Sequence, residues 1–248
     1  MSQRVAFVTG AGSGLGREIS EVLASKSIKV IVADINMAGA EETVSIIRES
    51  GNEAIAVLCD VTDLENVKNA VDESVRQYGK IDILVNNAGW DKVEPFLKSE
   101  PSIWQKIINI NLIGQLNTSK QILPIMIENG YGKVVNIASD AARVGSSGEA
   151  VYSAAKGGVI AFTKTIAREM ARHKINVNCV APGPSNTPLF KEIGEQHEGL
   201  TVALEKAIPF RRLAQPSDIA GAVAYFVSDE AEYVTGQTLS VSGGLTMI

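Results

Sequence analysis

Short apolar runs alternate with helical stretches along the whole chain. The apolar runs at 5–9, 30–34, 54–58, 81–86, 133–139 and 175–180 carry apolar residues at successive positions, and a last short run lies at 239–241. Successive apolar positions are typical of parallel strands that are covered on both faces. The intervening segments place apolar residues at helical spacing, as at Leu15, Ile19 and Leu23. The pattern therefore predicts an α/β fold built on a doubly wound parallel sheet.

The chain is expected to form one domain. No stretch rich in proline, glycine or serine divides it, and 248 residues suffice for one α/β core. We therefore expect a single Rossmann-type domain over 1–248. The least regular segment is 183–213, with prolines at 184, 188 and 209 and glycines at 194 and 199, and it is predicted to form a substrate lid.

Composition and charge exclude several classes of partner. The net charge of −5 offers no large basic field, so we expect neither nucleic acid nor an anionic membrane as a partner. No apolar run approaches the ~20 residues of a membrane helix. Cys59 and Cys179 lie in apolar runs and are expected to be buried, whereas His173 and His197 show no metal-ligand spacing. These features predict a cytoplasmic protein without a metal site.

The turn after the first predicted strand is the first candidate site. Residues 9–16 read TGAGSGLG, between a strand and a helix. Glycines let a backbone approach a pyrophosphate closely, and the helix N-terminus offers free N–H groups. The spacing Gly-x-x-x-Gly-x-Gly departs from the common Gly-x-Gly-x-x-Gly, and glycine-rich turns also occur without ligands. The flanking strand and helix nevertheless favour a dinucleotide site.

Asp34 bears on the choice of cofactor. It ends the second predicted strand, about 20 residues after the glycine loop, where an acidic residue can bind the adenosine ribose. The alternative is a helix N-cap, because Asn36 and Met37 begin the next predicted helix. A carboxylate at ~5 Å repels each unit of charge on the 2′-phosphate of NADP by about 3 kcal/mol at an effective dielectric of ~20. No Arg or Lys lies beside Asp34 or within the loop, so NAD is predicted in preference to NADP.

The second candidate site combines Ser139, Tyr152 and Lys156. Tyr152 and Lys156 are four residues apart in a predicted helix, so they share a face. Ser139 ends the preceding strand, at the sheet edge where α/β proteins bind ligands. Oxidation of a secondary alcohol requires a proton to leave the oxygen while a hydride leaves the carbon. A nearby lysine cation and the positive nicotinamide of the cofactor both favour the tyrosine phenolate, which makes Tyr152 the expected general base.

With these motifs in order, the whole chain resembles the short-chain dehydrogenase/reductase family. The further matching motifs are Asp60-Val61, Asn86–Gly89, Asn111 and Pro182-Gly183. The resemblance implies a nicotinamide-dependent enzyme that oxidises a secondary alcohol. It also implies that Asn111 acts with the other catalytic residues by kinking a helix, predicted over 104–123, and positioning a water. The alternative for Asn111 is an exposed polar residue on that helix.

The resemblance assigns roles to two sets of residues. The catalytic residues that it implies are Asn111, Ser139, Tyr152 and Lys156. The residues that it implies for binding NAD are Gly10, Ser13, Gly14, Leu15, Gly16, Asp34, Asp60, Val61, Asn87, Ala88, Gly89, Tyr152, Lys156, Pro182, Gly183, Ser185 and Thr187.

A closer resemblance concerns the substrate. Residues 136–152, 86–91 and 239–247 are similar to dehydrogenases of anaerobic aromatic degradation, which oxidise ring-bearing β-hydroxyacyl-CoA esters to β-ketoacyl-CoA esters. Substrates of this kind are 2-hydroxycyclohexanecarboxyl-CoA and 2-(hydroxyphenylmethyl)succinyl-CoA. This predicts a CoA thioester as the small-molecule substrate, with its acyl part between Trp90 and the lid residues Leu189 and Phe190.

Basic residues of the lid are candidates for the CoA phosphates. Lys191, Lys206, Arg211 and Arg212 lie there, and arginine forks suit phosphate groups. Ordinary solvated charge is an equally good interpretation. Looser relatives are the 3-oxoacyl-carrier-protein reductases, which usually use NADPH, and Asp34 counts against them.

Two further expectations concern activity and assembly. Some family members are non-catalytic partner subunits, but here the glycine loop, Asp34, Asn111 and the Ser139–Lys156 motif are all present, which favours an enzyme.

Family resemblance also implies a tetramer, either a homotetramer or a heterotetramer with a paralogous subunit.

Overall fold

The computed structural model describes residues 3–196 and 199–248 and has a seven-stranded parallel sheet at its centre. The strand order is β3-β2-β1-β4-β5-β6-β7, so the order reverses between β1 and β4. This is the doubly wound topology that the apolar runs predict. The strands are β1 Val5–Thr9, β2 Lys29–Asp34, β3 Ala54–Leu58, β4 Ile83–Asn86, β5 Gly132–Ile137, β6 Ile175–Pro182 and β7 Thr238–Val241.

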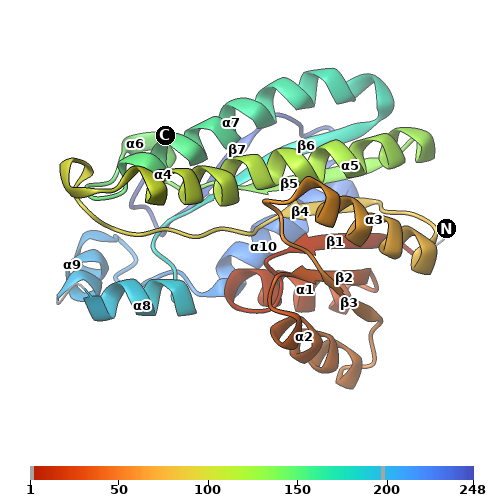
Figure 1. Ribbon diagram of the computed structural model, residues 1–248, viewed down its shortest axis with the longest axis horizontal. Coiled ribbons are helices and arrows are strands. Elements are labelled where there is room, and N and C mark those ends of the chain that lie inside the picture. Colours follow the sequence, from red (N-terminus) through yellow and green to blue (C-terminus); the bar gives the residue numbers. More distant parts are fainter. Residues whose placement is uncertain (1–2, 197–198) are drawn as a thin grey trace.

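Helices cover both faces of the sheet (Figure 1). One face packs against α1 (Gly14–Ser25), α2 (Met37–Glu49) and α10 (Pro216–Val227), and its core includes Ile19 and Val223. The opposite face packs against three further helices. These are α3 (Leu64–Tyr78), α5 (Gly114–Asn129) and α7 (Ala150–Met170). All five residues of β1 are buried, because both faces of this strand are covered, and this explains its unbroken apolar run.

The remaining helices lie at the carboxyl ends of the strands. They are α4 (Pro101–Ile108), α6 (Ala141–Val144), α8 (Pro188–Gln196) and α9 (Leu200–Ala207), with the short turn η1 (Phe96–Lys98). The short turns η3 (Ala171–His173) and η4 (Asp229–Ala231) lie at the opposite edge of the sheet, just before β6 and β7. Segment 183–213, predicted to be irregular, thus contains two helices. None of the helices in the described part of the chain is long and apolar enough to cross a membrane.

The helix predicted over 104–123 differs in the structure. It begins as α4, passes through a π-helical turn, η2 (Asn109–Ile113), and continues as α5 to Asn129. A π turn adds a residue to the helical repeat and commonly marks a functional position. Sequence periodicity does not reveal it, because the apolar pattern on either side remains helical.

A buried polar network ties the central strands to the helices above them. Asn86 on β4 donates to Asn136 on β5 at 2.8 Å and to Ser119 on α5 at 3.2 Å. Asn136 in turn donates to the Thr163 hydroxyl on α7 at 2.9 Å. Because buried amides are costly unless every group is bonded, this network fixes β4 and β5 against α5 and α7.

Candidate active site

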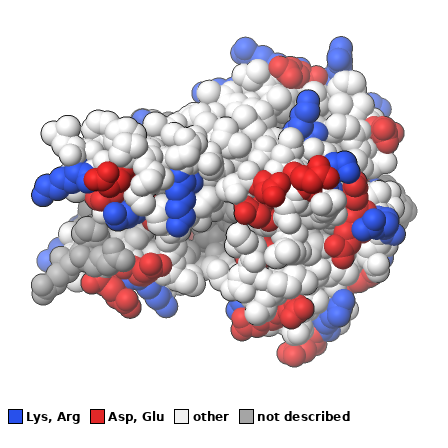
Figure 2. All heavy atoms as spheres, in the orientation of Figure 1, with Lys and Arg blue, Asp and Glu red and all other residues white. Residues whose placement is uncertain are grey.

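A cleft of ≈ 1220 Å³ opens at the carboxyl ends of the strands. Its walls come from the segments after β1, β4, β5 and β6, and from α4 and α8 on facing sides (Figure 1). Figure 2 shows this face hollowed at its middle, with acidic and basic side chains interspersed around the opening. Every site residue predicted from the sequence lines this cleft except Gly16 and Asn111, which are buried behind its wall.

The glycine loop is packed too tightly for side chains. Gly10 has φ +62°, and a Cβ on Gly16 would lie 2.1 Å from the Gly10 carbonyl oxygen. The Asn87 amide donates to the same carbonyl at 3.1 Å, so the loop is held against the segment after β4. Ser13, the N-cap of α1, makes no side-chain capping hydrogen bond. The first N–H groups of α1 therefore face the cleft without a side-chain acceptor, which suits a pyrophosphate.

Asp34 is held at the end of β2 with its carboxylate beside the glycine loop. One oxygen accepts from the Gly12 N–H and the other from the Asn36 N–H, both at 2.8 Å. The N-cap of α2 is Asn36, so the alternative reading of Asp34 as that cap is wrong. The carboxylate lines the cleft, where it can meet the ribose hydroxyls of a dinucleotide.

Arg17 directly follows the glycine loop in the chain, but its guanidinium is bonded to other groups and does not pair with Asp34. Its guanidinium bonds to the Glu42 carboxylate at 2.5 Å and to the Gly12 carbonyl at 2.6 Å. It does not line the cleft. The cleft wall at Asp34 therefore carries the negative charge that the sequence predicts, without a cation to offset it.

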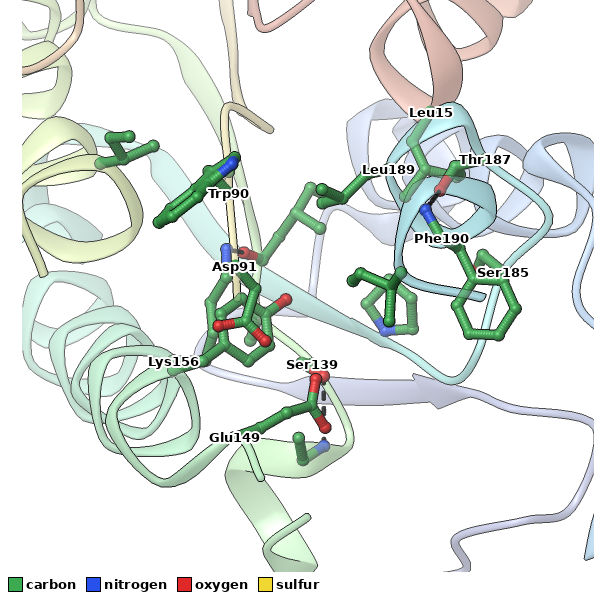
Figure 3. A pocket seen from close by; sticks show the side chains of 18 of the residues that line it. Leu15, Trp90, Asp91, Ser139, Glu149, Lys156, Ser185, Thr187, Leu189 and Phe190 are labelled. Carbon is green, nitrogen blue, oxygen red and sulfur yellow. Dashed lines mark hydrogen bonds between the residues drawn. The ribbon is translucent and has the colours of Figure 1, made fainter. Parts of the chain in front are cut away.

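Ser139, Tyr152 and Lys156 all line the cleft, and Figure 3 shows Ser139 and Lys156 on the same side of it. Ser139 lies two residues beyond the end of β5, and the other two lie on the first turns of α7. The Lys156 ammonium donates to the Ile137 carbonyl at 2.8 Å and lies 5.7 Å from the centre of the Tyr152 ring. The three polar groups are thus brought together as the sequence predicts.

The protein's own groups shift the pKa values of Tyr152 and Lys156 in a direction that the sequence did not suggest. Burial, followed by the Glu149 and Asp91 carboxyls, raises the pKa of Tyr152, and a hydrogen bond with Ser139 opposes this. Burial lowers the pKa of Lys156 to about 8. Burial and the two neighbouring carboxyls therefore oppose the phenolate in the protein without its cofactor. The expectation that Lys156 and the positive nicotinamide together favour the phenolate concerns the cofactor-bound state and stays a prediction.

Asn111 lies in the π turn and is fully buried, so its reading as an exposed helical residue is wrong. Its amide nitrogen donates to the Trp90 carbonyl at 2.6 Å and to the Ile107 carbonyl at 2.9 Å. Its amide oxygen accepts from the Trp90 N–H at 3.3 Å. Asn111 therefore anchors the segment after β4 to the helix behind the cleft.

Apolar groups line the substrate end of the cleft from two sides. Trp90 lies on one side, with the Lys106 ammonium 3.7 Å from the centre of its ring. Leu189 and Phe190, from α8, lie on the facing side (Figure 3). This arrangement agrees with the expected acyl site.

The structure does not bring the four basic residues of segment 183–213 to the cleft. Arg212 forms a two-pronged ion pair with Asp218, at 2.5 and 3.0 Å, and Arg211 donates to the Lys206 carbonyl. Neither these residues nor Lys191 line the cleft. Arg212 is thus already occupied by a carboxylate, which removes it as a ready partner for CoA phosphates.

Sequence reasoning assigned no role to two carboxyl groups in the cleft. Asp91 directly follows Trp90, and Glu149 is the N-cap residue of α7. They lie in segments 86–91 and 136–152, which carry the closer resemblance, and Glu149 comes three residues before Tyr152, which is the signal that the sequence offered. Figure 3 shows both side chains in the part of the cleft that holds Ser139 and Lys156.

The cysteines and histidines supply no further chemistry at this site. Cys59 and Cys179 are buried as expected, and burial raises the thiol pKa values to about 12 and about 11. Over residues 3–196 and 199–248, no group of three or more His, Cys, Asp or Glu side chains is placed to hold a metal ion. His173 is half-buried, and His197 lies outside the described residues.

Known proteins match this chain over almost its whole length. The family described as "Enoyl-(Acyl carrier protein) reductase" matches residues 10–246. The 3-oxoacyl-[acyl-carrier-protein] reductase FabG of Vibrio cholerae is 37% identical over 245 residues, with 99% of this chain and 98% of that protein covered. The chain belongs to the short-chain dehydrogenase/reductase family. It is accordingly an oxidoreductase that acts on a CH–OH or keto group, as the motifs predict.

Two further relatives bear on substrate and cofactor. The (2S)-[(R)-hydroxy(phenyl)methyl]succinyl-CoA dehydrogenase subunit BbsD of Thauera aromatica is 34% identical, with 100% of this chain and 98% of that protein covered. A variant of actinorhodin polyketide ketoreductase, solved with NADPH, superposes with a TM-score of 0.94 at 37% identity, with 98% of this chain and 97% of that chain covered. A nicotinamide dinucleotide therefore fits the glycine loop and cleft described above.

A substitution of Lys156 tests how much free energy of folding is lost by burying its ammonium. Its ammonium is buried with a lowered pKa, so its charge opposes folding below about pH 8, and this cost disappears as the pH rises toward 10.5. We expect Lys156→Met to raise the free energy of unfolding by about 1–3 kcal/mol at pH 7, and by less at pH 9.5. Urea unfolding at both pH values measures this.

The control is Lys164→Met, which removes an exposed lysine from the same helix. It should change the free energy of unfolding by less than about 0.5 kcal/mol at either pH. A Lys156→Met protein less stable than wild type at pH 7 contradicts the assignment of a buried, destabilising charge.

Proposed function

We propose that the protein interconverts a 3-hydroxyacyl thioester and the corresponding 3-oxoacyl thioester, with NAD as its cofactor. The observation that carries this is the meeting of Ser139, Tyr152 and Lys156 at the base of a cleft that begins at the glycine loop. The printed names of FabG and BbsD support the substrate class, because both name an acyl thioester with oxygen on the third carbon.

Tyr152, Ser139 and Lys156 each have a separate role in this reaction. In the oxidative direction the Tyr152 phenolate accepts the proton of the substrate hydroxyl, and in the reductive direction the phenol returns it. Ser139 donates a hydrogen bond to the substrate oxygen and fixes it beside Tyr152. Lys156 stabilises the phenolate and binds the nicotinamide ribose. The cofactor, when bound, takes up or supplies the hydride, so that alcohol and NAD give ketone, NADH and one proton.

Relatives favour a carrier protein over CoA as the thioester's carrier. The name 3-oxoacyl-[acyl-carrier-protein] reductase recurs among relatives from several other bacteria. The ring-bearing CoA ester expected from the sequence is the second candidate. It is supported by the likeness to BbsD and by Trp90 in the acyl part of the cleft.

The substrate assignment is tested with one 3-oxoacyl group on three carriers: acyl carrier protein, CoA and N-acetylcysteamine. We expect reduction of all three, with kcat/KM at least about 10-fold higher for the carrier protein than for N-acetylcysteamine, because remote contacts help to align the ketone. A ring-bearing CoA ester that surpasses the carrier-protein substrate decides for the second candidate. Turnover of simple alcohols without turnover of any thioester contradicts both.

The cofactor assignment depends on Asp34. Its carboxylate lines the cleft, with Arg17 committed to Glu42. Wild type should therefore prefer NAD over NADP by roughly 10² in kcat/KM. Asp34→Ala should narrow this ratio by relieving repulsion of the 2′-phosphate and losing bonds to the ribose. Kinetics with both cofactors measure it, and a wild-type preference for NADP overturns the assignment.

A further inference from the structure

A buried carboxyl group without hydrogen-bond donors faces the catalytic residues. Asp91 is only 6% exposed, and neither of its side-chain oxygens has a hydrogen-bond partner in the protein. Unsatisfied buried carboxylate oxygens cost free energy, so such a group calls for a functional explanation. Asp91 lines the cleft on the side that carries Lys156 (Figure 3), and its carboxyl acts on Tyr152.

The nearest acidic partner of Asp91 is a second carboxyl group. Glu149 interacts with Asp91 directly, and both carboxyls act on Tyr152. A hydrogen bond between two carboxyl groups requires a proton on one of them, and the raised pKa of Asp91 makes it the group that holds this proton. A pair that shares one proton keeps one negative charge in the wall of the cleft.

Other charged groups around the pair offset this charge only in part. From α7, the Lys156 ammonium, which donates to the Ile137 carbonyl, lowers the pKa of Asp91, but burial and Glu149 raise it by more. From α4, Lys106 lies over the Trp90 ring and is exposed, so water screens its charge. Burial and Glu149 raise the pKa of Asp91 to about 7, against the lowering effects of the Lys92 N–H and Lys156. Asp91 therefore holds a proton in part of the molecules at neutral pH.

We propose that Asp91 and Glu149 are specificity-determining residues that select an uncharged acyl derivative and reject the free carboxylate. The proposal rests on the proposed function and deepens it. When the reacting oxygen of a substrate lies between Ser139 and Tyr152, one of the two substituents on the reacting carbon extends past Asp91 and Glu149. A thioester or ester carbonyl there accepts the shared proton in a hydrogen bond. A carboxylate there meets a like charge in a poorly solvated site and is repelled.

The test uses 3-hydroxybutanoate and its methyl ester, with NAD, so that neither substrate carries a CoA or carrier-protein tail. The two differ only in whether the acyl end is charged. Wild type should oxidise the ester with a kcat/KM about 10²-fold higher than the acid. In the double variant Asp91→Asn/Glu149→Gln, kcat/KM for the acid should rise at least about 10-fold, whereas that for the ester should change by less than about 10-fold. A gain of activity toward the acid does not arise from poor folding.

Glu100→Gln is the matched control, because Glu100 is an exposed carboxyl on the same segment between β4 and α4. Its ester-to-acid ratio should equal that of wild type. If wild type oxidises the ester but the ratio is unchanged in the double variant, the assignment of Asp91 and Glu149 is overturned and the proposed function stands. If wild type turns over neither the methyl ester nor any thioester, the proposed function fails and this assignment fails with it.

Discussion

The site depends on the reversal of strand order between β1 and β4. Because every strand is parallel, the segments that leave β1 and β4 depart from the same sheet edge toward opposite faces, and a crevice opens between them. The glycine loop after β1 occupies one side of this crevice, and the segment after β4 occupies the other. The close approach of Gly16 to the Gly10 carbonyl and the Asn87 hydrogen bonds hold the two sides together. The cofactor end of the cleft is therefore a consequence of the topology.

The substrate end depends on charged groups that are held out of water at a cost. Burial disfavours the ammonium of Lys156, the phenolate of Tyr152 and the carboxylate of Asp91 alike. Burial brings the pKa of Lys156 to about 8 and that of Asp91 to about 7, close to neutral pH, whereas it moves the pKa of Tyr152 further from neutral. Hydrogen bonds among buried amides, from Asn86 and Asn136 in the sheet to Asn111 in the π turn, keep the surrounding backbone fixed. The free energy gained from these amide hydrogen bonds thus offsets the free energy that is lost by burying Lys156, Tyr152 and Asp91.

The sequence predicts what local pattern and short motifs determine. Strand positions follow from apolar runs, and the cofactor and catalytic residues follow from motifs at strand ends, so Asp34, Ser139 and Tyr152 line one cleft as expected. What it misses depends on contacts between distant segments. The family resemblance implies a kink at Asn111, in agreement with the π turn, but not the hydrogen bonds of Asn111 to Trp90 or the ion pair that holds Arg212 on Asp218. The raised pKa of Tyr152 likewise needs the positions of Glu149 and Asp91, which spacing along the chain does not give.

The central claim is that Tyr152 transfers the substrate proton in a site assembled for a nicotinamide dinucleotide. The most direct test is Tyr152→Phe, which removes the phenolic oxygen and keeps the ring that packs beside Lys156. Cofactor binding, followed by fluorescence titration, should stay within a few-fold of wild type. Turnover of the 3-oxoacyl thioester should fall by about 10² or more, the usual contribution of a positioned acid–base group. Turnover close to wild type in a variant that binds the cofactor normally contradicts the account.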